Sequence, residues 1–239
     1  MVDNLMVADL PADVIGFKYK LPCLAKAIAK GGPIKIVAMG SSSTAGRADV
    51  LPYPYWLEMY LRNDQSTNGN ARIDVINRGR GGEEADKEFD RFQEDIFELE
   101  PTLVIWQVGT NAVFHRQDYN IDAVAQKIEA GLDLLCADRT KMDVMLIDPQ
   151  YVTAMLKDDK AELSEYMVKL ISKKAELKGV SVFHRWALMR HWHVHNNISF
   201  ERMIDPTDPD QLHQSDASTQ RLARGLCDTI LKAAKDAGS

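Results

Sequence analysis

The segment Ile34-Lys35-Ile36-Val37-Ala38-Met39 is followed at once by Gly40-Ser41-Ser42-Ser43-Thr44-Ala45-Gly46. The first part is rich in apolar and β-branched residues without strict polar alternation, which is typical of a strand covered on both faces. The second part is a small polar loop bounded by glycines. In parallel sheets such loops present their side chains at the carboxyl edge of the strands, where ligands bind.

Similar strand-like runs recur further along the chain, at Ile73–Ile76, Leu103–Val108, Val144–Ile147 and Val180–Phe183. Apolar residues spaced by three and four predict helices, at Tyr55–Leu61, Glu83–Leu99, Ile121–Cys136, Leu163–Leu177 and Ala217–Ala234. This alternation predicts an α/β fold of three layers, α/β/α, with a central parallel sheet. We expect one domain over residues 1–239, in which residues 1–33 form an N-terminal extension and the first helix.

Two further polar segments come at predicted strand ends, namely Asn77-Arg78-Gly79-Arg80-Gly81-Gly82 and Gly109-Thr110-Asn111. A fourth, Asp210-Gln211-Leu212-His213, precedes the last predicted helix. Right-handed crossovers bring the carboxyl ends of all the strands to one edge of the sheet. The four segments together supply a hydroxyl nucleophile, a histidine base with a carboxylate, and N–H donors for an oxyanion. That set of groups is what acyl transfer through a serine requires.

Three better-known motifs are excluded by the spacing or identity of their residues. The Gly40–Gly46 loop has five residues between its glycines and no following lysine, so it is not a phosphate-binding loop. Glu84 occupies the position of the third glycine of a dinucleotide-binding fingerprint. No Gly-x-Ser-x-Gly elbow of an α/β-hydrolase is present. The histidines of His191-Trp192-His193-Val194-His195 lack further ligand spacing, so we predict neither a metal nor a cofactor.

The chain resembles the SGNH hydrolases, also called the GDSL esterase/lipase family, at all four sequence blocks of that family. The nucleophile block matches Gly40–Gly46 with Ser42 in the nucleophile position, although Ser41 replaces the family's aspartate. The second block matches residues 77–82, the third matches residues 109–111, and the last, Asp-x-x-His, matches residues 210–213. The resemblance implies the flavodoxin-like SGNH hydrolase fold.

The resemblance also implies a role for each matched residue. Ser42 is the nucleophile, His213 is the general base, and Asp210 orients the imidazole. The oxyanion hole consists of the N–H groups of Ser42 and Gly82 and the side chain of Asn111. Because three serines are consecutive, Ser41 and Ser43 remain alternatives for the nucleophile.

Arg78 and Arg80 flank the predicted oxyanion loop, and both are candidates for binding an anionic substrate. The alternative is that they are solvated surface charges.

The expected function is that of a serine esterase that removes short acyl groups, such as acetyl on a carbohydrate, through an acyl-enzyme. An O-acyltransferase with the same site and a non-catalytic binding module are the alternatives. The net charge of −6 excludes a generally basic nucleic-acid-binding surface. No apolar run reaches 18 residues, so no transmembrane segment is predicted. Residues 1–20 lack a signal-peptide pattern, so a cytoplasmic protein is the default, with a periplasmic or secreted one open if a leader was removed.

Overall fold

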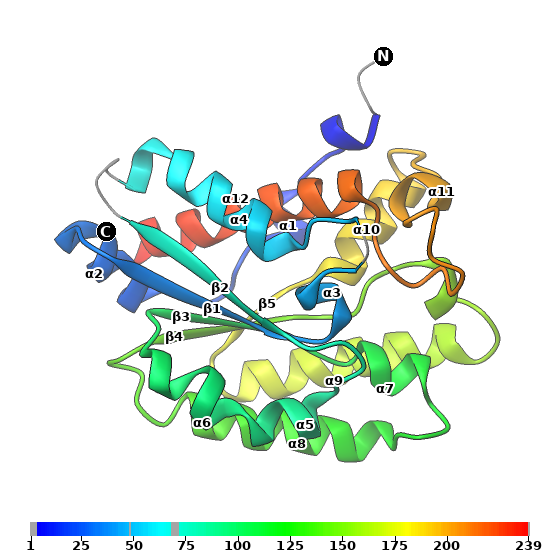
Figure 1. Ribbon diagram of the computed structural model, residues 1–239, viewed down its shortest axis with the longest axis horizontal. Coiled ribbons are helices and arrows are strands. Elements are labelled where there is room, and N and C mark those ends of the chain that lie inside the picture. Colours follow the sequence, from blue (N-terminus) through cyan, green and yellow to red (C-terminus); the bar gives the residue numbers. More distant parts are fainter. Residues whose placement is uncertain (1–3, 48, 68–71, 239) are drawn as a thin grey trace.

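The computed structural model describes residues 4–47, 49–67 and 72–238, and its centre is a parallel sheet of five strands (Figure 1). The strands are β1 (Ile34–Gly40), β2 (Ile73–Gly79), β3 (Leu103–Gln107), β4 (Asp143–Ile147) and β5 (Ser181–Phe183). Their order is β2-β1-β3-β4-β5, and every neighbouring pair is parallel. This is the flavodoxin-like order, in which ligands bind where the winding reverses, between β1 and β3. The predicted α/β sheet is confirmed, with each strand boundary within three residues of its expected position.

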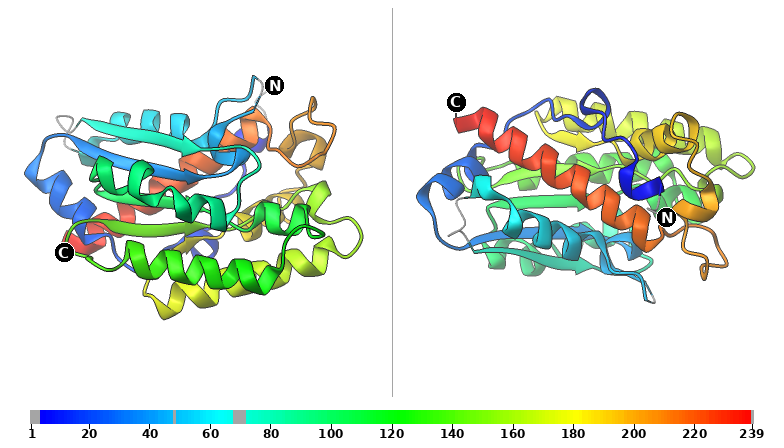
Figure 2. Two further views of the ribbon diagram at one scale, coloured as in Figure 1. Left: turned by 60° about the horizontal axis from the view of Figure 1, so that its bottom comes forward. Right: turned by 90° about the horizontal axis from the view of Figure 1, so that it is seen from above.

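Helices cover both faces of the sheet (Figure 2). One layer is built on α4 (Tyr53–Asn63) and α12 (Asp216–Gly238), and the other on α5 (Ala85–Asp90), α8 (Ile121–Leu135) and α9 (Lys160–Leu177). The remaining helices are η1 (Asn4–Val7), α1 (Ala12–Ile15), α2 (Pro22–Lys30), α3 (Ser42–Ala45), η2 (Gln65–Thr67), α6 (Phe92–Asp95), η3 (Phe97–Leu99), α7 (Thr110–Phe114), η4 (Thr153–Met155), α10 (Arg185–Val194) and α11 (Phe200–Met203). None of the helices in the described part of the chain has the length and apolar run needed to cross a bilayer.

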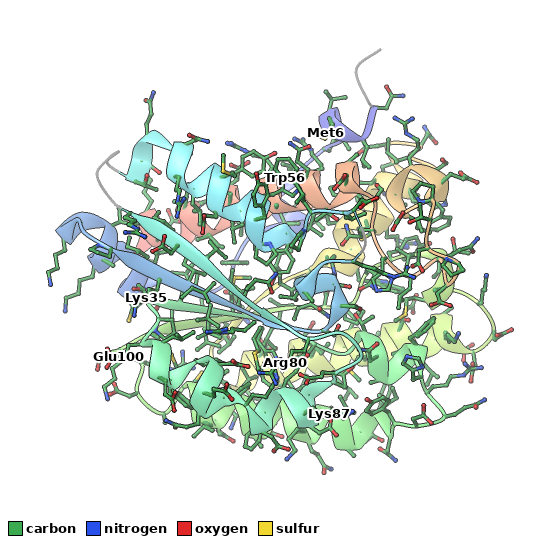
Figure 3. The ribbon with its side chains drawn as sticks, in the orientation of Figure 1. Met6, Lys35, Trp56, Arg80, Lys87 and Glu100 are labelled. Atoms are coloured by element: carbon green, nitrogen blue, oxygen red, sulfur yellow. The ribbon has the colours of Figure 1, made fainter. Side chains whose placement is uncertain are left out.

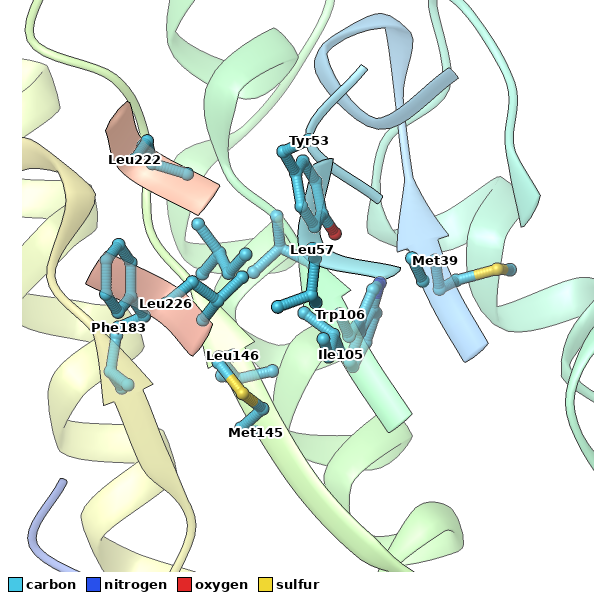
Figure 4. Packing of buried hydrophobic residues seen from close by; sticks show 14 of the residues in the cluster. Met39, Tyr53, Leu57, Ile105, Trp106, Met145, Leu146, Phe183, Leu222 and Leu226 are labelled. Carbon is cyan, nitrogen blue, oxygen red and sulfur yellow. The ribbon is translucent and has the colours of Figure 1, made fainter. Parts of the chain in front are cut away.

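The core lies between the sheet and these two layers. Leu57 of α4, Leu226 of α12 and Ile105 of β3 are fully buried members of one apolar cluster (Figure 4). Trp106, the next residue of β3, packs edge-to-face on Phe92 with 5.0 Å between the ring centroids. Each such side chain contributes about 1.5–3 kcal/mol through burial of its apolar surface. Burial of these side chains therefore stabilises β3 between the two helical layers.

The helix predicted over Glu83–Leu99 is wrong as a single element. It is divided into α5, α6 and η3, with the first break at Arg91, where the backbone leaves helical geometry at φ −99° and ψ 3°. The Arg91 guanidinium is buried and bonds to Glu83, Asp95 and the carbonyl oxygen of Arg78. The break therefore coincides with the polar contacts of the Arg91 side chain. The spacing of apolar residues does not predict such contacts.

Candidate active site

The Ser42 hydroxyl is carried by the first residue of α3, directly beyond the carboxyl end of β1. The N–H of a first helical residue has no acceptor within its own helix. The Ser42 N–H is therefore available to a ligand at the same position as its hydroxyl. Ser41 is buried, whereas Ser42 and Ser43 are half-buried.

The end of β2 approaches the nucleophile helix closely because Gly79 has no side chain. A Cβ atom at Gly79 would lie 2.2 Å from the backbone nitrogen of Ala45, a clash that no L-residue could avoid without moving α3. The Asn77 side chain connects the same two segments, since its Nδ2 donates to the carbonyl oxygen of Thr44 at 2.7 Å. The loop after β2 is therefore held against the helix that carries Ser42.

His213 contacts the nucleophile. Its Nε2 lies 2.8 Å from Ser42 Oγ, and its Nδ1 lies 2.8 Å from Asp208 Oδ2. A carboxylate only accepts hydrogen bonds, so the ring proton resides on Nδ1 and Nε2 is free to accept the Ser42 proton. This is the arrangement of nucleophile, base and orienting acid that activates a serine.

The acid that orients His213 is Asp208, which corrects the expectation of Asp210. Asp208 Oδ2 also accepts the backbone N–H groups of Leu212 and His213, at 2.9 and 2.8 Å. Gln211 takes a left-handed conformation, at φ 56°, and the reversed chain brings His213 back over Asp208. Asp210 is exposed. Both aspartates precede His213 closely in the sequence, and only this path of the backbone distinguishes them.

Asp208 is fully buried at its carboxylate and forms an ion pair with Arg47. Burial by itself would raise the pKa of this carboxyl, but hydrogen bonds from the His213 backbone and side chain and the Leu212 backbone outweigh it. The net result is a pKa below the ordinary value, so Asp208 stays ionised at neutral pH. Arg47, which the sequence did not single out, thus belongs to the site through Asp208.

The predicted oxyanion donors come from the loop after β2 and from α7. Gly82 is exposed and left-handed, at φ 77°, and a Cβ atom on the preceding Gly81 would lie 3.8 Å from Ser42 Cβ. Asn111 is buried on α7, where its Nδ2 donates to the carbonyl oxygen of Glu83 at 2.6 Å. An amide nitrogen carries two hydrogens, so the second hydrogen of Asn111 remains for a ligand. The roles of Gly82 and Asn111 as donors remain predictions.

A buried polar network underlies the site and was not anticipated. Thr110 Oγ1 lies 3.3 Å from Gln107 Nε2 and 3.0 Å from Gln150 Oε1. Gln107 also faces the hydroxyl of Thr44 in α3, at 3.3 Å, and Gln150 donates to the carbonyl oxygen of Leu212 at 3.1 Å. These side chains connect the nucleophile helix, α7 and the histidine loop. Buried networks of this kind rigidify the segments that they join.

Arg78 and Arg80 both reach Asp95, with N–O distances of 3.5 and 3.4 Å. Arg80 lies above α5, whereas Lys35 and Glu100 lie at the opposite, amino-terminal end of the sheet (Figure 3). Arg78 and Arg80 remain about half-exposed, at 40% and 51% of the side chain. Both arginines thus form ion pairs with Asp95. Their role in binding an anionic substrate stays a prediction.

In the described ranges, no three or more His, Cys, Asp or Glu side chains are grouped so as to hold a metal ion. The histidines of residues 191–195 have other contacts. The rings of His191 and His195 lie 4.8 Å apart, and His193 stacks on Phe200 at 4.2 Å.

A cavity of about 20 Å³ touches both Ser42 and His213, with Arg47 and Asp205 among its other lining residues. Larger cavities, of about 640 and 560 Å³, are lined by residues of α2 and α12 and by residues around the end of α8. Neither larger cavity includes Ser42 or His213 in its lining. The small cavity does not include Gly82 or Asn111 in its lining, and a further cavity of about 300 Å³ is lined by Asp208, Gln211 and Phe200.

A family model matches residues 7–236, almost the whole chain. The chain belongs to the Non-GDSL lipase-like family. Membership, together with the contacts among Ser42, His213 and Asp208, confirms the prediction of a serine ester hydrolase of the SGNH type.

Solved structures share the fold of this lipase-like protein at low sequence identity. An acetylxylan esterase from Geobacillus stearothermophilus matches with a TM-score of 0.68 and 20% identity, over 84% of this chain and 95% of that chain. A lipase/acylhydrolase from Enterococcus faecalis matches with a TM-score of 0.65 and 19% identity, over 83% of this chain and 96% of that chain. No curated protein sequence matches the chain.

Proposed function

We propose that this protein hydrolyses short-chain esters, with acetyl groups on a carbohydrate as the substrate class, through an acyl-enzyme on Ser42. The observation that carries the proposal is the 2.8 Å contact between His213 Nε2 and Ser42 Oγ, backed by Asp208 at 2.8 Å from Nδ1. A binding module has no need of a base in contact with a serine.

The first half-reaction forms the acyl-enzyme. His213 Nε2 takes the Ser42 proton as Oγ attacks the ester carbonyl carbon, and Asp208 stabilises the imidazolium that forms. The N–H groups of Ser42 and Gly82 and the free hydrogen of Asn111 stabilise the oxyanion. The C–O bond to the alcohol then breaks, and the leaving alkoxide takes the proton from His213.

The second half-reaction repeats these steps with water. His213 accepts a proton from the water, which attacks the acyl carbon, and the tetrahedral intermediate expels Ser42 Oγ. The proton returns to Ser42, and a carboxylic acid leaves.

One observation supports a short acyl group on a sugar. The structural relative from Geobacillus stearothermophilus is an acetylxylan esterase, which supports an acetylated carbohydrate as the class to test first.

The test is a series of p-nitrophenyl esters from acetate to octanoate, followed by acetylated xylo-oligosaccharides. We expect kcat/KM to be highest for acetate, acetate release from the sugars, and no turnover of either substrate by Ser42→Ala. A preference for octanoate would overturn the short-chain assignment. Activity on aryl acetates with none on acetylated sugars would overturn the carbohydrate assignment.

A further inference from the structure

Glu84 is a buried carboxylate two residues after the predicted oxyanion donor Gly82, and only 1% of it is exposed. It precedes α5, and its Oε1 accepts the N–H of Ala85 at 3.0 Å. The same oxygen accepts the N–H of Gly109 at 3.0 Å, and Oε2 accepts the N–H of Ala112 at 2.8 Å. One carboxylate thus joins the start of α5 to the start of α7.

The two bonds to α7 lie on either side of Asn111 in the chain. Gly109 precedes the helix in a left-handed conformation, and a Cβ atom there would lie 2.8 Å from Met167 Cγ. Asn111 itself donates from Nδ2 to the carbonyl oxygen of Glu83. Two consecutive residues, Glu83 and Glu84, therefore hold the Asn111 side chain and the backbone on either side of it through three hydrogen bonds.

Burial raises the pKa of Glu84, and hydrogen bonds from the N–H groups of Gly109, Ala112 and Ala85 oppose that rise, so Glu84 is the ionised member of its buried pair with Glu88. Three N–H groups point at its carboxylate, which accepts but does not donate when ionised. Glu88, one turn later, is also buried and receives one bond, from Trp106 Nε1 at 2.7 Å. Burial and the charge of Glu84 raise the pKa of Glu88 well above its ordinary value, so Glu88 holds a proton.

We propose that Glu84 is a positioning residue for ester hydrolysis, holding the Asn111 amide where the oxyanion forms. The inference rests on the proposed function, because the position matters only if Asn111 stabilises a transition state. A charge buried at this depth costs free energy unless donors surround it, and these donors belong to the segments that carry Gly82 and Asn111. Positioning of this kind affects the chemical step more than substrate binding.

The test is Glu84→Gln, with Glu88→Gln as the matched control one helical turn away. The glutamine carbonyl can take the place of Oε1, but its NH₂ group then faces the N–H of Ala112, donor against donor. We expect kcat for p-nitrophenyl acetate to fall about 10- to 10²-fold with KM within about twofold, since small misplacement of a catalytic group has effects of this size. Glu88→Gln removes no charge and should keep the wild-type kcat.

A double-mutant cycle separates positioning from general loss of structure. If Glu84 acts through Asn111, then Glu84→Gln should have little further effect on kcat in an Asn111→Ala background. Full additivity, or a wild-type kcat for Glu84→Gln, would overturn the inference. Should Glu84→Gln fail to fold, Glu84→Asp keeps the charge with a shorter reach and carries the same expected split between kcat and KM. An inactive wild-type protein would instead reject the proposed function.

Discussion

Asp208 Oδ2 lies 2.8 Å from Nδ1 of His213, five residues further along the chain. The same oxygen accepts the backbone N–H of His213, so the carboxylate fixes both the ring and the main chain of the base. The orientation of the general base therefore depends on one buried side chain, and this dependence is open to a direct test.

Asp208→Asn should lower kcat by about 10⁴-fold, because an amide presents a hydrogen to the ring and favours the wrong tautomer. Asp210→Asn should stay within about twofold of wild type, since Asp210 is exposed and does not contact the ring. Hydrolysis of p-nitrophenyl acetate by both variants gives the comparison, with thermal unfolding as the control for folding. A loss in Asp210→Asn with normal turnover in Asp208→Asn would restore the sequence-based assignment.

Asn111→Ala should lower kcat by about 10²–10³-fold with little change in KM, as removal of one oxyanion donor does in other hydrolases. The reason is that, in the proposed mechanism, the free amide hydrogen of Asn111 is used only once the carbonyl oxygen becomes negative. Steady-state kinetics with one short-chain ester measure both constants. If KM rises while kcat is unaffected, Asn111 binds the substrate rather than the transition state.

Glu88→Gln should change the pH dependence of stability. Burial raises the pKa of Glu88 in the folded protein well above its ordinary value of 4.5, so the native state holds a proton that the unfolded chain releases near that pH. The contribution of Glu88 to stability is therefore present below that pH and is lost as the pH rises through the folded-state pKa. Glutamine has no ionisable proton, so Glu88→Gln does not show this loss. The Tm of the variant minus the Tm of the wild type should therefore increase from pH 4 to pH 8. A Tm difference that does not change with pH would show that Glu88 is ionised in the native state.

Arg80→Ala should reduce kcat/KM about two- to fivefold for a carboxylate-bearing ester and leave a neutral ester unaffected, as expected for a half-exposed ion pair. The loss should shrink at high salt because surface charges are screened. Arg72→Ala is the control, since Arg72 is an exposed arginine near the start of β2, at the other end of the strand. Equal effects on both esters would leave Arg80 as a partner of Asp95 alone.

The strand pattern and the placement of the strand-end loops followed from the sequence because both are local properties. A run such as Ile34–Met39 is apolar throughout only when both faces are covered, and parallel topology then brings Ser42 and Asn111 to one edge. The identity of the acid did not follow, because Asp208 and Asp210 differ only in the path of the chain around Gln211. The hydrogen bonds that Glu84 accepts from α7 could not be predicted either, because an acidic residue at the start of a helix is common for its interaction with the helix dipole. The bonds of Glu84 to Gly109 and Ala112 join segments that are far apart in the sequence.

Covalent labelling identifies the nucleophile most directly. A fluorophosphonate reacts with a serine that a histidine activates, and peptide mass spectrometry locates the adduct within the segment Ser41-Ser42-Ser43. The 2.8 Å contact with His213 predicts a single adduct on Ser42, and none in Ser42→Ala or His213→Ala. An adduct on Ser41 or Ser43, or a Ser42→Ala variant that still labels and still hydrolyses p-nitrophenyl acetate, would contradict it.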